Sequence, residues 1–447
     1  MSARQFNPYP AYKDSGVEWL GEIPAHWEVN RTKFAARLRS GHTPSRQHPE
    51  YWQDCTIPWF GLADVWQIRE GQIEYVYETT EKISELGLAN SAARLLPKGT
   101  VILSRTASVG FSAILGVDMA TTQDFVNWVC RPTLQPEYLL YVFRSMEHEF
   151  RRLTMGSTHQ TIYMPAVGGF STPIPPVPEQ DQIVAVVRKE TARIDALVAK
   201  KGRLIELLQE QRTALITRAV TKGLDPNVPM KDSGVEWLGE IPARWEVRRL
   251  RHISPNLGVG VVVNPSNYVA SVGLPFLYGS DISEGQIDAE QSRRISPHDS
   301  KRLPKSQLHA GDLVMVRVGA PGVTAVVPPE LEGANCASLL VIRRSPGVAS
   351  SWLCYALNSR YVRSQIEVVQ YGAAQEQFNV RHAVNFVVAV PPLREQESVA
   401  AFLGHHTERI DTLAAKIREA IDHLQELRTA LISAAVTGKI DVREEVA

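Results

Sequence analysis

The chain has 447 residues, of which 44% are hydrophobic and 21% are charged, and its 48 basic residues balance 48 acidic ones. This composition is typical of a folded protein with more than one domain, and it excludes disorder as the main state. No run of 18 apolar residues and no secretory signal is present, so we expect a cytoplasmic protein with no membrane partner and four reduced cysteines.

The first element along the chain is a 17-residue entry segment, KDSGVEWLGEIPAHWEV at residues 13–29, which recurs at residues 231–247. Sixteen of the 17 positions agree, and only His26 and Arg244 differ. A second repeat aligns residues 191–225 with residues 407–441 at 20 of 35 positions. The chain is therefore one unit that occurs twice.

The segment after the first entry motif shows the mixed pattern of an α+β domain. A strand is predicted at Thr100–Ser104 and a helix at residues 136–153. Arg105 follows this strand and precedes a glycine-containing turn, so it either reads a guanine edge or pairs with a carboxylate that orders the turn. The polar loop at residues 156–161 is either a base-reading loop or an ordinary solvated one. For Trp59, Trp66 and Tyr163 we favour core packing over stacking on bases.

A long helix is predicted at residues 180–220, with a length of about 60 Å at 1.5 Å per residue. It follows Pro175-Pro176 and Glu179-Gln180, a pattern repeated at residues 391–396. Its apolar residues form a stripe at spacings of three, four and seven, which a single helix cannot bury. We expect it to pack against its own repeat, either to stiffen the chain or to separate two DNA-reading domains by one 34 Å turn or more. The stripes comprise Ile194, Leu197, Leu204, Leu208, Leu215 and Ile216, and Ile410, Leu413, Ile417, Ile421, Leu424, Leu427 and Leu431.

The second half follows the same order with a diverged middle. Strands are predicted at Asp312–Arg317, Val323–Val327, Ser338–Ile342 and Asn385–Val390, and a helix at residues 351–368. Three short islands survive between the halves: residues 57–60 parallel residues 274–277, residues 99–110 parallel residues 311–322, and EGQI at residues 70–73 recurs at residues 284–287. Arg317 therefore occupies the place of Arg105. Two unequal domains on one constant frame suit an asymmetric target with two parts.

Motifs of catalysis are absent from the sequence. No GxxxxGK[ST] phosphate loop, complete GxGxxG, HExxH or GxSxG pattern is present. Residues 264–268, NPSNY, differ from the NPPY-type motif of adenine methyltransferases at the second proline and are read as a turn. We therefore expect a non-catalytic protein without a bound cofactor or metal.

The two entry segments, the PP-x-x-EQ elements, the T-x-RID segments, LQE-x-RTALI and AVT-G resemble the specificity subunits of type I restriction-modification systems over essentially the whole chain. The resemblance implies two target-recognition domains that each read half of a bipartite site in double-stranded DNA. It also implies two long antiparallel helices that form a coiled-coil-like spacer and dock two methyltransferase subunits. Motor-nuclease subunits would join them, and S-adenosylmethionine, ATP and Mg would lie on these partners.

The predicted division is residues 1–174 and 226–390 for the recognition domains, and 175–225 and 391–447 for the helical regions. The alternatives are a recognition subunit of another methylation-based defence system, a helical scaffold without DNA specificity and an undetected fused enzyme. A second polar loop, residues 372–379, occupies the corresponding place of the second half and is followed by Arg381. The candidate DNA-binding residues lie in the two arginine turns and in or just after the two polar loops: Ser104, Arg105, Thr106, His159, Gln160, Arg317, Gln375, Gln377, Asn379 and Arg381.

Overall fold

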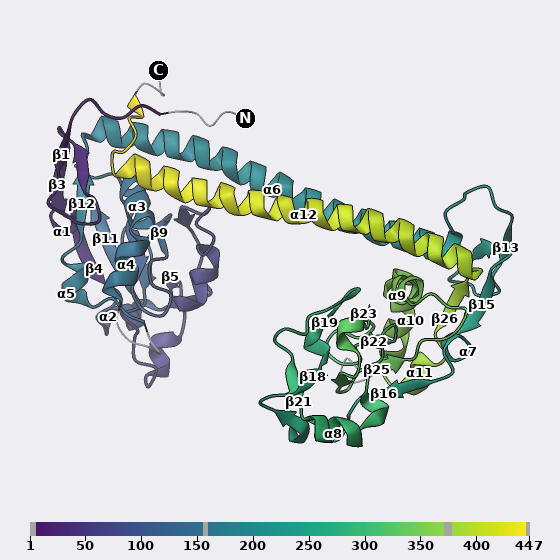
Figure 1. Ribbon diagram of the computed structural model, residues 1–447. Helices are drawn as coiled ribbons and strands as arrows, with labels where there is room; N and C mark the ends of the chain where they lie inside the picture. The colour runs from purple at the N-terminus through teal and green to yellow at the C-terminus, as the bar shows by residue number, and fades with distance from the viewer. Residues whose placement is uncertain (1–5, 155–159, 371–377, 444–447) are drawn as a thin grey trace. The chain divides into compact units, whose positions relative to one another are not determined.

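The computed structural model describes residues 6–154, 160–370 and 378–443 (Figure 1). It has two compact units, one made of residues 1–202 and 418–447 and the other of residues 203–417. Two long helices, α6 (Val177–Lys222) and α12 (Leu393–Val436), run from one unit into the other. The predicted α+β class and the pair of long helices are confirmed, while the four predicted domain limits stay a prediction.

Among its described residues, the first unit contains two sheets of three or more strands and five short helices. The larger sheet has the strand order β4-β11-β8-β9-β6, and the smaller has β10-β5-β7. The strands are β4 (Ala36–Ser40), β5 (Ile57–Phe60), β6 (Tyr75–Val76), β7 (Glu81–Ile83), β8 (Val101–Ser104), β9 (Ser112–Leu115), β10 (Ala120–Thr121) and β11 (Phe125–Cys130). The helices are α1 (Thr32–Ala35), α2 (Glu85–Ala89), α3 (Pro136–Ser145), α4 (Glu147–Leu153) and α5 (Met164–Val167), with 3-10 turns at Pro49–Trp52 and Leu62–Gln67.

The second unit repeats this plan with shorter strands. Its sheets have the orders β16-β25-β22-β23 and β17-β21-β18-β24, and β19 pairs with β20. The strands are β16 (Leu257–Val259), β17 (Val269–Ala270), β18 (Leu274–Leu277), β19 (Ile282–Ser283), β20 (Gln286–Ile287), β21 (Arg293–Ile295), β22 (Leu313–Met315), β23 (Thr324–Val326), β24 (Asn335–Cys336) and β25 (Leu340–Ile342). The helices are α7 (Leu250–Ile253), α8 (Pro297–Arg302), α9 (Ser350–Asn358), α10 (Arg360–Gln370) and α11 (Val380–Ala383), with 3-10 turns at Pro265–Tyr268, Gly279–Asp281, Pro304–Ser306 and Pro329–Leu331.

Each diverged domain begins and ends on a pair of hydrogen-bonded strands. In the first unit β3 (Glu28–Arg31) pairs antiparallel with β12 (Ser171–Ile174), and in the second β15 (Glu246–Arg249) pairs with β26 (Val387–Val390). Each entry segment also forms a small hairpin, β1 (Tyr12–Asp14) with β2 (Glu22–Pro24), and β13 (Met230–Asp232) with β14 (Glu240–Pro242). The diverged domain is thus an insertion between two strands of the repeated frame.

The start of each long helix is fixed by the repeated Glu-Gln pair. The Gln180 amide donates to the carbonyls of Thr133 (3.0 Å) and Pro175 (2.9 Å), and its Oε1 accepts from the backbone N–H of Gln135 (2.9 Å). Gln396 makes the same three contacts, with Gly347, Pro391 and Ala349. Because buried amides need all their partners, this glutamine joins the helix start to the domain in both units.

The end of each helix contacts the entry segment of the other repeat. Lys439, beyond α12, donates to the Glu22 carbonyl in the first unit (2.8 Å), and Lys222, at the end of α6, donates to the Glu240 carbonyl in the second. Each entry segment is therefore held between the start of one long helix and the end of the other. This arrangement makes α6 and α12 antiparallel.

The same arginine and aspartate of the two helix repeats pair across the helices. Arg428 binds Asp195 in the first unit (Nε–Oδ1 3.0 Å), and Arg212 binds Asp411 in the second (Nε–Oδ1 3.0 Å). We call these the cross-helix pairs. Each arginine also reaches the domain: Arg428 donates to the Gly71 carbonyl (2.9 Å), and Arg212 contacts the Glu284 carboxylate (3.1 Å). The EGQI island therefore lies where each domain meets the helices.

Only part of the predicted apolar stripe is buried. Ile194, Leu208 and Ile216 are buried in α6, as Ile417 is in α12. Leu204 and Leu413 instead expose 44% and 46% of their surface, because a helix that packs on a single partner covers only one side of a stripe this wide.

The buried carboxylate of Glu179 joins the start of α6 to the N-terminal segment of the first unit. It accepts hydrogen bonds from Tyr9 (2.8 Å) and Trp27 (2.9 Å) and contacts His26 (2.8 Å). Glu179→Ala leaves these groups without their acceptor, so we expect it to lower the free energy of unfolding by about 3 kcal/mol in urea denaturation. The matched Glu395→Ala should cost about 1 kcal/mol, because Glu395 pairs with the exposed Arg244. Equal losses would contradict this difference.

Candidate nucleic-acid interface

The Arg105 turn is fastened to the polar loop that the sequence also singles out. The Ala107 N–H donates to the Gln160 carbonyl (2.9 Å), and the Ile162 N–H donates to the Arg105 carbonyl (2.9 Å). Thr106 and Thr161 form an isolated bridge in this contact. The two candidate segments of the first half therefore form one surface, although they lie more than 50 residues apart in the sequence.

The Arg317 turn repeats this arrangement in the second half. The Arg317 Nε donates to the Phe378 carbonyl (3.1 Å), and the Phe378 N–H donates back to the Arg317 carbonyl (3.4 Å). Both turns close on a glycine with positive φ, 96° at Gly110 and 93° at Gly322. A side chain there would be strained, and at Gly110 its Cβ would also lie 3.2 Å from Phe150.

Neither arginine is held by a carboxylate among the described residues. Arg105 Nε donates to the Gln123 carbonyl (3.1 Å), so both guanidinium groups order their turns through backbone oxygens. Burial lowers the pKa of Arg317 from its ordinary value, as expected for a cation without a negative partner. Such a side chain keeps donors that can bind a guanine edge or a phosphate.

The remaining sequence candidates differ in their placement. Ser104 is buried and its hydroxyl faces the Thr106 carbonyl (3.4 Å), so it serves the turn. Gln160, Asn379 and Arg381 are exposed, and Thr106 is half-buried. His159, Gln375 and Gln377 lie outside the described residues. Of the aromatic residues expected to pack, Trp59 is in the core, whereas Trp66 and Tyr163 expose 69% and 58% of their surface.

A basic cluster that the sequence reasoning missed lies beside α11. The Arg249 and Arg251 guanidinium groups both donate to Asn385 Oδ1 (3.2 and 3.3 Å), and Asn385 Nδ2 donates to the Arg381 carbonyl (3.0 Å). These contacts continue the surface that starts at Arg317. The signal was present in the sequence, because the run RRLRH at residues 248–252 begins where the entry repeat ends.

The first unit has a related surface with more aromatic character. Arg31 and Lys33 occupy the places of Arg249 and Arg251, on either side of the first residue of the short helix α1. Phe34 follows them and exposes 63% of its surface. Basic side chains with exposed aromatic rings suit phosphate contacts and stacking on bases. The two halves therefore offer different chemistry at equivalent places.

The described residues also lack the features of a metal site and of a membrane span. No cluster of three or more His, Cys, Asp or Glu side chains that could hold a metal ion occurs in the described ranges. Within the same ranges, no helix is both long enough and apolar enough to cross a membrane.

Residues 24–207 match the family described as type I restriction modification DNA specificity domain. The type I restriction enzyme MjaIX specificity subunit of Methanocaldococcus jannaschii is 24% identical over 436 residues, which cover 95% of this chain and 96% of that protein. The EcoKI specificity subunit of Escherichia coli strain K12 is 20% identical and covers 94% and 90%.

Two solved structures share the fold. A chain from a structural study of complex assembly and conformational transition of the type I R-M system aligns with a TM-score of 0.72 and 18% identity, over 94% of this chain and 99% of that one. The HsdS subunit of Thermoanaerobacter tengcongensis aligns with a TM-score of 0.53 and 19% identity, over 94% and 98%.

Proposed function

Because the chain belongs to the family of type I restriction-modification specificity subunits, we propose that it selects the DNA sequence on which a type I complex acts. Each diverged domain reads one half of an asymmetric bipartite site in double-stranded DNA. The observation that carries this proposal is the insertion of two different domains between equivalent strand pairs, β3–β12 and β15–β26. A frame that holds two unlike readers suits a target with two unlike halves.

The reading surfaces are the arginine turns with their neighbouring loops. Arg105 and Arg317 provide guanine-reading donors, and the exposed amides of Gln160 and Asn379 suit adenine edges. The Arg249–Arg251 cluster provides phosphate contacts, which set affinity and position without reading sequence. Basic groups are gathered at these surfaces although the whole chain is neutral.

The helices α6 and α12 act as the spacer between the two readers and as the docking surface for two methyltransferase subunits. The continuity of α6 over 46 residues supports a spacer role, since a helix of that length spans about 70 Å. The exposed leucines Leu204, Leu207 and Leu413 support a docking role, since isolated helices in water seldom present several such side chains together.

Catalysis lies on the partners in this proposal. The methyltransferase subunits bind S-adenosylmethionine and methylate adenine, and motor-nuclease subunits with ATP and Mg cleave DNA. The chain itself is the non-catalytic member of the complex. Two weak readers on one frame gain affinity because binding of the first positions the second.

The proposal is tested by expressing the chain with its methyltransferase subunit in a host without adenine methylation, and sequencing the modified bases of the genome. We expect methylated adenines in one bipartite motif with a fixed gap. The same host with the methyltransferase subunit alone is the control. Methylation that does not depend on the chain, or that follows one uninterrupted motif, would contradict the proposal.

Arg317 and Arg251 should differ in how their loss affects recognition. Arg317→Ala should cost about 1–3 kcal/mol of discrimination at one half-site, roughly 5- to 150-fold, because a bidentate base contact is lost. Arg251→Ala should weaken all sequences alike and lower the salt slope of binding by about 1. DNA binding by the methyltransferase complex on half-site variants measures both. Unchanged binding of Arg317→Ala would leave Arg317 only its role in ordering the turn.

A further inference from the structure

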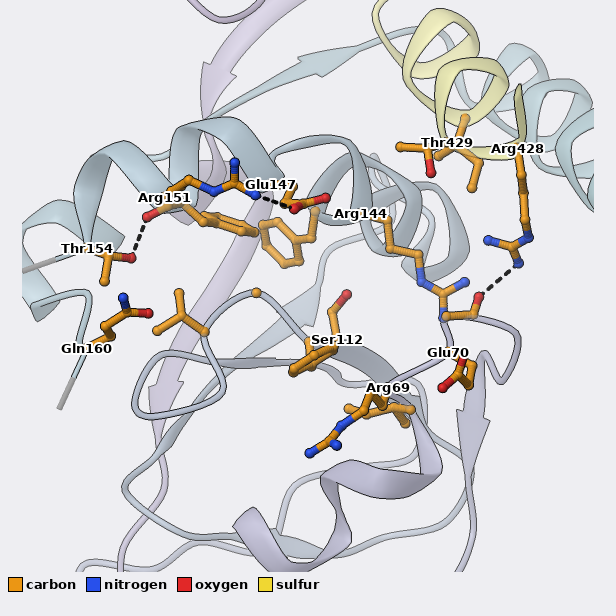
Figure 2. A pocket seen from close by; sticks show the side chains of 18 residues that line it. Arg69, Glu70, Ser112, Arg144, Glu147, Arg151, Thr154, Gln160, Arg428 and Thr429 are labelled. Atoms are coloured by element: carbon orange, nitrogen blue, oxygen red, sulfur yellow. Dashed lines mark hydrogen bonds and ion pairs between the residues drawn. The ribbon is translucent and has the colours of Figure 1, made fainter. Parts of the chain in front are cut away.

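A cavity of about 490 Å³ lies in the first unit between its diverged domain and α12 (Figure 2). Its walls come from the Arg69–Gly71 loop, the turn before β9, α3, α4 and the last part of α12. The phenylalanines Phe111, Phe143 and Phe150 contribute an apolar side, and arginines contribute a basic side. A cavity of this volume falls in the range of small-molecule sites.

The hydroxyl of Ser112 is an unpartnered polar group in this cavity. Ser112 is 2% exposed, and its Oγ has no hydrogen-bond partner among the residues that the structure describes. Figure 2 shows this oxygen pointing into the hollow. In the second half the equivalent hydroxyl, on Thr324, donates to the Gly322 carbonyl (2.9 Å). Ser112 follows Gly110 by two residues, as Thr324 follows Gly322, so the two hydroxyls occupy equivalent places in the fold. They differ only in whether a hydrogen-bond acceptor is within reach.

Arg144 is a cation without a carboxylate partner on the same cavity. Its Nη2 donates to the Ile73 carbonyl (2.6 Å), the one acceptor it has in the described part of the chain. Burial lowers the pKa of Arg144 to about 10, and the positive charge of Arg428 acts in the same direction. Asn358 stands at the corresponding place of the second half, where it is bonded to the backbone N–H and carbonyl of Thr324. At this place the polar groups of the second half are hydrogen-bonded to one another, whereas the Ser112 hydroxyl of the first half has no partner among the described residues.

The other charged groups leave the cavity positive. Arg151 is paired with Glu147 (2.8 Å), and Arg428 is paired with Asp195. Arg69 and Glu70 lie at the exposed edge and balance one another in charge. Arg144 therefore remains as the lining cation without an ion-pair partner in the described part of the chain, although the Glu74 and Asp195 carboxylates act on it at longer range. It lies next to a hydroxyl donor and an apolar wall.

We propose that this cavity binds a small organic phosphate of about the size of a mononucleotide. The Arg144 guanidinium and the Ser112 hydroxyl donate to the phosphoryl oxygens, and the phenylalanine side receives the organic part. Guanidinium groups bind phosphate oxygens with strong charge-assisted hydrogen bonds. The volume exceeds what inorganic phosphate needs, which favours a ligand with a group attached. This site adjoins the Arg105 reading surface, because Gly110 and Gln160 also line it. The corresponding hollow of the second half is lined by Asn358 in place of Arg144, and its hydroxyl, on Thr324, is already hydrogen-bonded.

The test is calorimetric titration of the purified full-length chain with adenosine 5′-monophosphate, inorganic phosphate and adenosine. We expect the monophosphate to bind most tightly, and Arg144→Gln to weaken it roughly 10-fold or more. Ser112→Ala should weaken it roughly 3-fold while leaving the thermal midpoint of unfolding unchanged, because the hydroxyl has no partner without the ligand. Thr324→Ala is the matched control, and it should lower the midpoint without changing the affinity.

Three results would overturn the proposal. These are no binding of the monophosphate, binding that Arg144→Gln and Ser112→Ala leave unchanged, and equal affinity for phosphate and the monophosphate. Competition between the monophosphate and duplex DNA would also overturn it, because a DNA phosphate would then be the natural occupant. Independent binding of the two supports a separate small-molecule site.

Discussion

Exchange of residues 30–170 for the corresponding segment of another specificity subunit is expected to change one half of the target and leave the other half intact. The junctions fall on the paired strands β3 and β12, where Asn30 lies opposite Thr172. Both ends of the insert therefore lie side by side, and the exchange leaves the contacts of Glu179 with Tyr9, His26 and Trp27 in place. Sequencing of methylated adenines before and after the exchange measures the result.

The matched experiment exchanges residues 250–386, which lie between β15 and β26. It should change the opposite half of the target and keep the one altered by the first exchange. The gap between the halves should stay the same in both experiments, because neither touches α6 or α12. A change in both halves after one exchange would refute the separation of the two readers.

Insertion of seven residues into both long helices is expected to lengthen the gap between the half-sites by about 3 base pairs. Seven helical residues add about 10 Å, and DNA rises about 3.4 Å per base pair. Suitable points are between Gly202 and Arg203 and between Ala420 and Ile421. Each cross-helix pair then stays on one side of the insertions, and a seven-residue step keeps the apolar stripe in phase. The new gap is read directly from the methylated motif.

The control inserts the same seven residues into α6 alone. Arg212 follows Asp195 by 17 residues, as Arg428 follows Asp411, so an insertion in one helix prevents the two cross-helix pairs from forming together. We expect a thermal midpoint lower by about 5 °C or more and a loss of methylation. An unchanged gap after the paired insertion would contradict the spacer role of the helices.

The long helices could be predicted from the sequence because their signals are local. The predicted range of residues 180–220 lies within the observed Val177–Lys222. Pro178 in the first turn and Gly223 with a φ of 76° just beyond the end explain the limits. Their register could not be predicted, since neither the RID nor the RTALI segment shows which residue of the other helix it meets.

The limits of the short helices were less predictable, because tertiary packing and not local sequence determines where they begin and end. Residues 136–153 read as one helix but form α3 and α4, which are separated at Met146, and no proline or glycine marks the break. Phe150 of α4 packs on Phe143 of α3 and on Phe170, and the contact with Phe170 joins α4 to a residue that follows α5. Base-reading side chains are equally hard to predict, because the local sequence does not show whether an arginine in a turn faces a carbonyl or open solvent.

The first unit is made of both ends of the chain, and this sets the order in which the two units can fold during synthesis. The first unit needs residues 418–447 to be complete, whereas the second unit is one uninterrupted stretch, residues 203–417. At about 5–20 residues per second, the ribosome takes roughly 10–40 s to make that stretch. During this interval the apolar side of the first half of α6, with Ile183 and Val187, has no α12 to cover it. The part of the protein made first is therefore the last to finish folding, and its nascent helix is the segment most in need of protection from aggregation.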